Sequence, residues 1–176
     1  MTYMKRSTWR GLLTTGVLLL ILTLILPRFE ILQIRFFCAP AAFLTSIFLG
    51  APLRVIETGY AIHMSKPIEV TTACSAINFF SLTLAVFAGL AVGSRWSFRS
   101  LLCLLPAAYL LTLLANTSRI VSTWYTDTLA ALWFPDSLHK GIHALAGAVI
   151  FMTALSFGYY ILWRLFNEHE NEETAA

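Results

Sequence analysis

The sequence changes character within the stretch Val70-Thr71-Thr72-Ala73-Cys74-Ser75-Ala76-Ile77-Asn78-Phe79-Phe80. Before it the chain is charged and β-prone, and after it a long apolar run begins. Such a junction is typical of the point where a chain passes from water into a lipid bilayer. Cys74 lies at the junction, where its thiolate would be solvated, whereas a thiolate in the middle of a bilayer is strongly destabilised. Cys74 is therefore a candidate nucleophile.

The composition of the whole chain indicates an integral membrane protein. Of its 176 residues, 58% are hydrophobic and 12% are charged, and the mean hydropathy is +0.74. A soluble domain of this length could not bury so much apolar surface. The small net charge of +3 comes from scattered Lys and Arg, which argues against nucleic-acid binding. We expect one polytopic membrane domain over residues 1–166 and a short acidic cytoplasmic tail over residues 167–176.

The predicted fold class is an all-α integral membrane protein with four transmembrane helices, five or six being the alternatives. The segment Phe36–Leu49 is short and contains Pro40, which favours an interfacial or re-entrant helix over a further span. Asn116–Arg119 is expected to end the third span, and the amphipathic segment Ile120–Phe134 to lie in the interface. The four predicted spans are Gly11–Leu26, Ala73–Gly93, Ser100–Ala115 and Leu138–Leu165.

A short extended region is predicted ahead of the Cys74 helix. Tyr60–Met64 and Ile68–Thr71 are rich in β-prone residues, and Ser65-Lys66-Pro67 separates them as a turn would. We expect these two segments to pair with each other over the outer surface of the membrane.

The distribution of basic residues predicts the topology. Met1–Arg10 carries three basic residues and no acidic one, and two arginines lie within residues 95–99. By the positive-inside tendency both segments are cytoplasmic, which places Cys74 outside. The following helix then returns Arg119 to the outer side, and the last helix begins there near His143. We therefore expect a multi-pass membrane protein with its site on the outer side of the membrane.

Cys74, Arg119 and His143 are the candidate catalytic residues. Acyl transfer requires a nucleophile, a proton carrier and a group that stabilises the developing oxyanion. A thiol at a helix start suits the first role, a histidine the second and an arginine the third. The supporting candidates are Asn116, which could orient Arg119, Asn78, one helical turn after Cys74, and His139, the alternative to His143.

Three motifs in this order resemble the exosortase/archaeosortase family of membrane cysteine transpeptidases. The first motif has two parts. Leu49-Gly50-x-Pro52, Glu57-x-Gly59 and Ile68-Glu69-Val70 are similar to the family's extended lead-in. Ala73-Cys74-Ser75-Ala76-Ile77 is similar to its Cys-Ser-Gly-Ile nucleophile motif. The second, Asn116-x-x-Arg119-Ile120, is similar to its Asn-x-x-Arg element. The third, His143-x-x-x-Gly147-x-x-x-Phe151, is similar to its His-x-x-x-Gly element.

The resemblance implies a location, a substrate and a reaction. The location is the bacterial inner (cytoplasmic) membrane, with the site on the periplasmic side. Members of the family cleave a C-terminal sorting signal of exported proteins through a cysteine thioester, and an acceptor at the cell surface, such as a membrane lipid, or water then resolves it. The small size and the Asn-Phe-Phe after the cysteine motif resemble a compact subtype, the K type. This chain departs from the family pattern at Ala76, where Gly is usual, and at Asn78, where Arg is usual. The oligomeric state is left open, and no cofactor is implied.

Other functions compete with this interpretation. His139 and His143 are four residues apart, a spacing that also suits a metal pair, but the sequence offers no obvious third ligand. A non-catalytic assembly or anchoring subunit would use intramembrane polar residues to hold helices together. A small transporter would use Arg119 and Asp127 to line a path, although the sequence has no inverted repeat.

Overall fold

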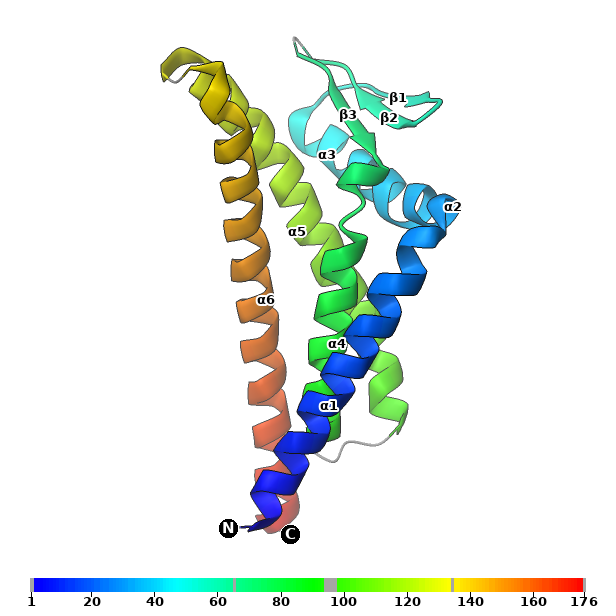
Figure 1. The fold of residues 1–176 in the computed structure, drawn as a ribbon, viewed down its shortest axis with the longest axis vertical. Helices are drawn as coiled ribbons and strands as arrows, with labels where there is room; N and C mark the ends of the chain where they lie inside the picture. The colour runs from blue at the N-terminus through cyan, green and yellow to red at the C-terminus, as the bar shows by residue number, and fades with distance from the viewer. Residues whose placement is uncertain (1, 65, 94–97, 134, 176) are drawn as a thin grey trace. The chain divides into compact units, whose positions relative to one another are not determined.

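The protein is mostly helical, with one small antiparallel sheet (Figure 1). The structure, a computed structural model, describes residues 2–64, 66–93, 98–133 and 135–175. The α-helices are α1 (Thr2–Ile25), α2 (Glu30–Leu32), α3 (Ala39–Leu49), α4 (Ile77–Gly93), α5 (Phe98–Trp133) and α6 (Asp136–Ala175). The strands are β1 (Leu53–Ile56), β2 (Gly59–Ile62) and β3 (Ile68–Thr71). Shorter helical turns are η1 (Leu26–Arg28), the π-helical η2 (Gln33–Cys38) and the 3-10 turn η3 (Thr72–Cys74).

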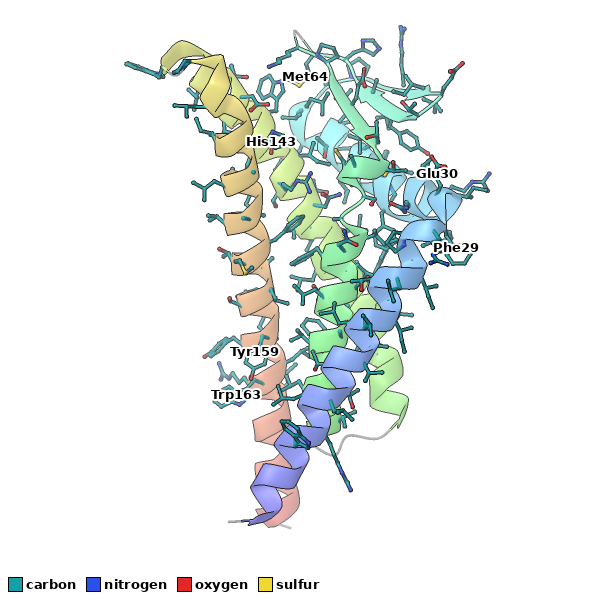
Figure 2. All side chains as sticks on the ribbon, in the orientation of Figure 1. Phe29, Glu30, Met64, His143, Tyr159 and Trp163 are labelled. Carbon is teal, nitrogen blue, oxygen red and sulfur yellow. The ribbon has the colours of Figure 1, made fainter. Side chains whose placement is uncertain are left out.

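The helices confirm the expected membrane fold. Within the described part of the chain, five helical stretches are long and apolar enough to cross a membrane: Trp9–Arg28, Glu30–Leu49, Thr72–Val92, Cys103–Leu129 and Gly141–Leu165. Near the end of the last stretch, Tyr159 and Trp163 are exposed (Figure 2). Aromatic side chains at this position are typical of the belt at a membrane interface.

The segment Glu30–Leu49 is a longer helix than its sequence indicated. Pro40 does not interrupt it, because Pro40 lies in the first turn of α3, where a missing N–H is tolerated. The π-helical turn η2 directly before it changes the hydrogen-bond register at the same point. Phe36–Leu49 is therefore part of a continuous helical stretch of span length, which corresponds to the five-helix alternative.

The chain divides into two compact units, and α5 and α6 contribute to both. The first unit comprises Met1–Arg28, Asn78–Leu111 and Leu155–Ala176. Within it, α1 and α4 approach closely at small residues. A Cβ atom on Gly89 would lie 2.8 Å from the Gly11 carbonyl oxygen and would overlap the Thr15 hydroxyl. Small residues at such crossings let helix backbones come close enough for extensive packing.

The second unit comprises Phe29–Ile77 and Thr112–Ala154, and it contains the sheet. The strand order is β1-β2-β3 with antiparallel pairing, and α3 packs against β1 and β2 (Figure 1). The predicted pairing of the two segments before Cys74 is confirmed, since β2 pairs with β3. The prediction missed β1, so the extended region has three strands. Ile62 and Val70 are completely buried and form part of the core of this unit.

The expected end of a helix at Asn116–Arg119 was wrong. Helix α5 runs without a break from Phe98 to Trp133, so Ile120–Phe134 is not a separate interfacial helix. The run Asn-Thr-Ser-Arg is polar, but it contains neither Gly nor Pro and therefore does not force the helix to stop. Asn116 and Thr117 are buried, which shows that tertiary packing accommodates these polar residues inside the helix.

Candidate active site

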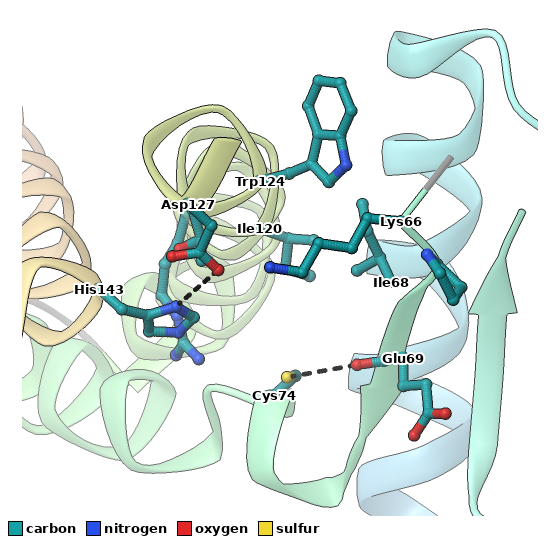
Figure 3. A pocket seen from close by; sticks show the side chains of 11 residues that line it. Lys66, Ile68, Glu69, Cys74, Ile120, Trp124, Asp127 and His143 are labelled. Atoms are coloured by element: carbon teal, nitrogen blue, oxygen red, sulfur yellow. Dashed lines mark hydrogen bonds and ion pairs between the residues drawn. The ribbon is translucent and has the colours of Figure 1, made fainter. Parts of the chain in front are cut away.

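A pocket in the second unit brings together residues from three separate parts of the chain (Figure 3). Its cavity volume is about 140 Å³, which is enough for several water molecules or part of a ligand. The lining comes from β3 and the residues before it, from η3, from α5 and from α6. The lining residues are Lys66, Pro67, Ile68, Glu69, Cys74, Arg119, Ile120, Thr123, Trp124, Asp127 and His143.

Cys74 is held by the turn that joins β3 to α4. It is the last residue of η3, and α4 begins three residues later at Ile77. The half-buried thiol points toward the main-chain carbonyl of Glu69, at 3.9 Å from its oxygen (Figure 3). Cys74 therefore precedes the helix rather than forming its first turn, and its Sγ atom faces the pocket.

Two hydrogen bonds fix the backbone around Cys74. The Asn116 side-chain amide donates to the carbonyl oxygen of Cys74 at 2.6 Å. The Ser75 hydroxyl donates to Gln33 Oε1 at 2.9 Å, and both side chains are buried. A buried, fully satisfied polar pair of this kind specifies one local geometry. Asn116 thus contacts the backbone of the candidate nucleophile, whereas the sequence had suggested that it orients Arg119.

Arg119 lies along the face of α6 that carries the third motif. A Cβ atom on Gly147 would be 3.2 Å from Arg119 Cδ, so the absence of a side chain there makes room for the arginine stem. The guanidinium carbon is 5.4 Å from the centre of the Phe151 ring, a cation–π distance. The spacing His143-x-x-x-Gly147-x-x-x-Phe151 therefore has a physical reason. Gly147, one turn after His143, leaves room for the Arg119 side chain, and Phe151, two turns after His143, supplies the aromatic ring.

His143 is paired with an acidic residue that the sequence analysis did not assign to the site. Its Nδ1 atom is 3.7 Å from Oδ2 of Asp127 (Figure 3). The two side chains are 45% and 27% exposed, so the contact is accessible to solvent. A carboxylate on one ring nitrogen favours a proton there and leaves the other nitrogen free to accept one.

Asp127 could have been found had α5 been predicted as one helix. Asn116, Ile120, Thr123 and Asp127 are separated by four, three and four residues, which places them on one helical face. The prediction of a break after Arg119 removed this relationship. The sequence instead indicated that Asp127 is a polar residue on a separate interfacial helix.

The remaining predicted residues are distributed differently. Asn78 lies in α4, its side chain is exposed, and among the described residues it does not belong to the pocket lining. The side chain of His139 lies outside the described residues. Where the structure does describe side chains, no group of three His, Cys, Asp or Glu residues is arranged to hold a metal ion. Cys38 is completely buried and donates to the Thr71 carbonyl at 3.1 Å, and Cys103 is exposed.

The chain is similar to a known family of membrane proteins. The family model described as "Transmembrane exosortase (Exosortase_EpsH)" matches residues 3–160, which is most of the chain and includes every pocket residue. No curated protein and no solved structure matches at a significant level.

Proposed function

The chain belongs to the transmembrane exosortase family, and on this premise we propose that it is a membrane-embedded cysteine transpeptidase or protease. Its substrates are exported proteins that carry a C-terminal sorting signal. The observation that carries the proposal is that Cys74, Arg119 and His143 line one pocket although they lie far apart in the sequence. These three side chains supply the nucleophile, the cation and the proton carrier that acyl transfer requires.

The reaction begins when the Cys74 thiolate attacks the carbonyl carbon of the scissile peptide bond. A carbon–sulfur bond forms, and the negative charge moves to the carbonyl oxygen, where the Arg119 guanidinium stabilises it. The tetrahedral intermediate then collapses as the carbon–nitrogen bond breaks. His143 donates the proton taken from the thiol to the leaving amine, which leaves the substrate joined to Cys74 as a thioester.

An acceptor completes the reaction. A hydroxyl or amino group of a membrane lipid or cell-surface molecule, or water, gives a proton to His143 and attacks the thioester. The carbon–sulfur bond breaks, and the Cys74 thiolate is regenerated. Transfer and hydrolysis differ only in the acceptor.

Two further residues position the reacting groups. Asp127, paired with Nδ1 of His143, holds the imidazole ring so that Nε2 is available for proton transfer. Asn116 holds the Cys74 carbonyl and thereby the turn that presents the thiol. Neither residue needs to contact the substrate.

We place this site on the outer side of the cytoplasmic membrane. The two arginines within residues 95–99 are cytoplasmic under the positive-inside rule, and Cys74 precedes the helix that leads to them. A reaction with exported proteins requires this side, because the sorting signal reaches it after translocation.

The experiment that tests the proposal follows a candidate substrate in cells. A tagged, exported, membrane-anchored protein encoded near this gene is expressed with the wild-type chain, with Cys74→Ala, with Cys74→Ser or with Cys103→Ala. We expect both Cys74 variants to abolish the size shift of the tagged protein at normal enzyme levels, and Cys103→Ala to retain it. Processing that persists in Cys74→Ala would exclude the thioester mechanism.

A further inference from the structure

The backbone of β3 has a free edge, and its direction follows from the pairing of the sheet. The His63 N–H donates to the Pro52 carbonyl at 2.9 Å, which continues the β1–β2 ladder and directs the odd-numbered residues of β2 toward β1. Tyr60 and Ile62 must therefore bond to β3, where their partners are Val70 and Ile68. It follows that Glu69 and Thr71 direct their N–H and C=O groups away from the sheet.

Two thiols lie on this outward side, which supports the assignment independently. The Thr71 carbonyl accepts a hydrogen bond from Cys38 Sγ, and the Glu69 carbonyl lies 3.9 Å from Cys74 Sγ. The hydrogen bond from Cys38 occupies the Thr71 carbonyl, and Pro67 has no N–H. Glu69 therefore offers the main-chain N–H and C=O pair nearest to Cys74. Within the described chain, no backbone hydrogen bond satisfies the Glu69 N–H. This edge forms one side of the pocket, since residues 66–69 belong to its lining.

The opposite side of the pocket also carries unsatisfied polar groups. Thr123 and Trp124 of α5 both line it, and Thr123 is 8% exposed. The Thr123 hydroxyl and the Trp124 indole N–H are buried and make no hydrogen bond to any described residue.

We propose that the free edge of β3 binds the substrate as an extended peptide that adds a fourth strand to the sheet. The inference rests on the proposed function and specifies how that site takes its substrate. The substrate residue opposite Glu69 exchanges main-chain hydrogen bonds with it, and a neighbouring residue presents its carbonyl to Cys74. The Cys74 thiol lies 3.9 Å from the Glu69 carbonyl oxygen, so a peptide paired with Glu69 lies next to the thiol.

Pairing through the backbone has a consequence for specificity. Main-chain hydrogen bonds supply affinity for any extended peptide, and only alternate side chains face the pocket. Thr123 and Trp124 line the side of the pocket opposite β3. A helical or folded segment could not pair with the edge, so the cleaved segment must be unfolded and lie outside the membrane-spanning helix of the substrate.

The first test removes the N–H of Glu69 and nothing else from the ladder. Glu69→Pro eliminates that donor, while the bonds of Ile68 and Val70 to β2 remain, and proline is tolerated on edge strands. The matched control is Val55→Pro, because Val55 lies on the other free edge of the same sheet and is 79% exposed. We expect processing of the tagged substrate to fall about fivefold in Glu69→Pro, the effect of losing one net hydrogen bond, and to be unchanged in Val55→Pro.

The side chain of Glu69 is tested separately. Glu69→Ala removes the carboxylate and keeps the N–H, so it must reduce processing less than Glu69→Pro. Equal losses in the two variants, or an equal loss in Val55→Pro, would overturn the proposal.

The second test uses the protein with an intact sheet. A synthetic fluorescent peptide that spans the mapped cleavage site is titrated into purified Cys74→Ala protein in detergent, and each peptide nitrogen is methylated in turn. Edge pairing predicts that methylation weakens binding about fivefold at the residue whose N–H donates to the Glu69 carbonyl, and has little effect at its two neighbours, whose N–H groups point away from β3. Uniform or absent effects would contradict the proposal.

These outcomes separate the inference from the proposed function. Loss of processing in Cys74→Ala together with no alternation in the methylated peptides would leave the thioester mechanism standing and remove the β3 site. Alternating binding together with unchanged processing in Cys74→Ala would retain the β3 edge as a peptide site and remove the mechanism.

Discussion

Ala76 occupies a backbone conformation that L-residues rarely adopt, two residues after the candidate nucleophile. Its φ is 53°, in the left-handed region, where Cβ approaches the following carbonyl oxygen. The strained residue lies between the turn that carries Cys74 and the start of α4, so it sets the angle between them. The usual glycine of the family at this position therefore has a conformational reason, and this chain keeps the conformation without it.

Ala76→Gly should leave stability unchanged or raise it. The left-handed conformation costs alanine about 1 kcal/mol, and replacing it with glycine removes this cost. Glycine also makes the unfolded chain more flexible, which lowers the free energy of unfolding by about 0.4–1 kcal/mol. The control is Ala73→Gly, at an exposed position of η3 without positive φ, which should lower stability. Thermal unfolding of both variants in detergent measures the difference, and a lower midpoint for Ala76→Gly than for Ala73→Gly would contradict the argument.

Asp127→Asn should reduce turnover and leave substrate binding almost unchanged. Asparagine can hold the imidazole ring of His143 in the wrong orientation and does not stabilise its charged form, so the loss should be about 100- to 10,000-fold. Asp127→Glu should restore part of the rate, because the carboxylate is retained. The measurement is the initial rate of processing against substrate level. An effect confined to the substrate concentration at half-maximal rate would assign Asp127 to binding.

At the scale of elements, the sequence predicted helices and the site motifs better than it predicted where helices end. The apolar runs identify the membrane helices because lipid leaves no alternative for the backbone. Helix α5 continues through Asn116, whose side chain bonds the Cys74 carbonyl 42 residues away in sequence, and local propensity does not indicate such a contact. The edge strand β1 was missed for a related reason: it is flanked by turn residues and exposes Arg54 and Val55, so it lacks an apolar face of its own.

The packing of α6 against Arg119 makes a prediction about one glycine. Gly147→Val would insert methyl groups where a single Cβ already comes within 3.2 Å of Arg119 Cδ, so the arginine must move from its place over Phe151. We expect a fall in processing of about tenfold or more, the range for removing one oxyanion-stabilising group being about 100- to 1,000-fold. Gly141→Val is the control on the same helix, since a Cβ there meets nothing within 4 Å. Equal activity in the two variants would mean that Arg119 has no fixed position.

At the scale of the whole molecule, the pocket and the close packing of α1 with α4 fall in different parts of the chain. All pocket residues belong to the second unit, and the close packing of α1 with α4 belongs to the first. Much of the remaining helix surface is apolar and exposed, as in α1, where Leu12, Leu13 and Leu20 are each more than 60% exposed. Such surface suits lipid contact and contributes nothing to the site. Damage to the first unit should therefore lower the amount of folded protein without changing the reaction.

Gly89→Ala tests this division. The added Cβ would overlap the Thr15 hydroxyl and press on the Gly11 backbone, and overpacking of this kind costs about 1–3 kcal/mol. Gly16→Ala is the matched control, because a Cβ on Gly16 meets nothing within 4 Å. We expect a lower unfolding temperature and a lower cellular level for Gly89→Ala alone. The processing rate per folded molecule, counted by labelling Cys74 with an impermeant maleimide, should equal that of the wild type. A reduced rate per labelled Cys74 would show instead that helix packing in the first unit governs the reactivity of the site.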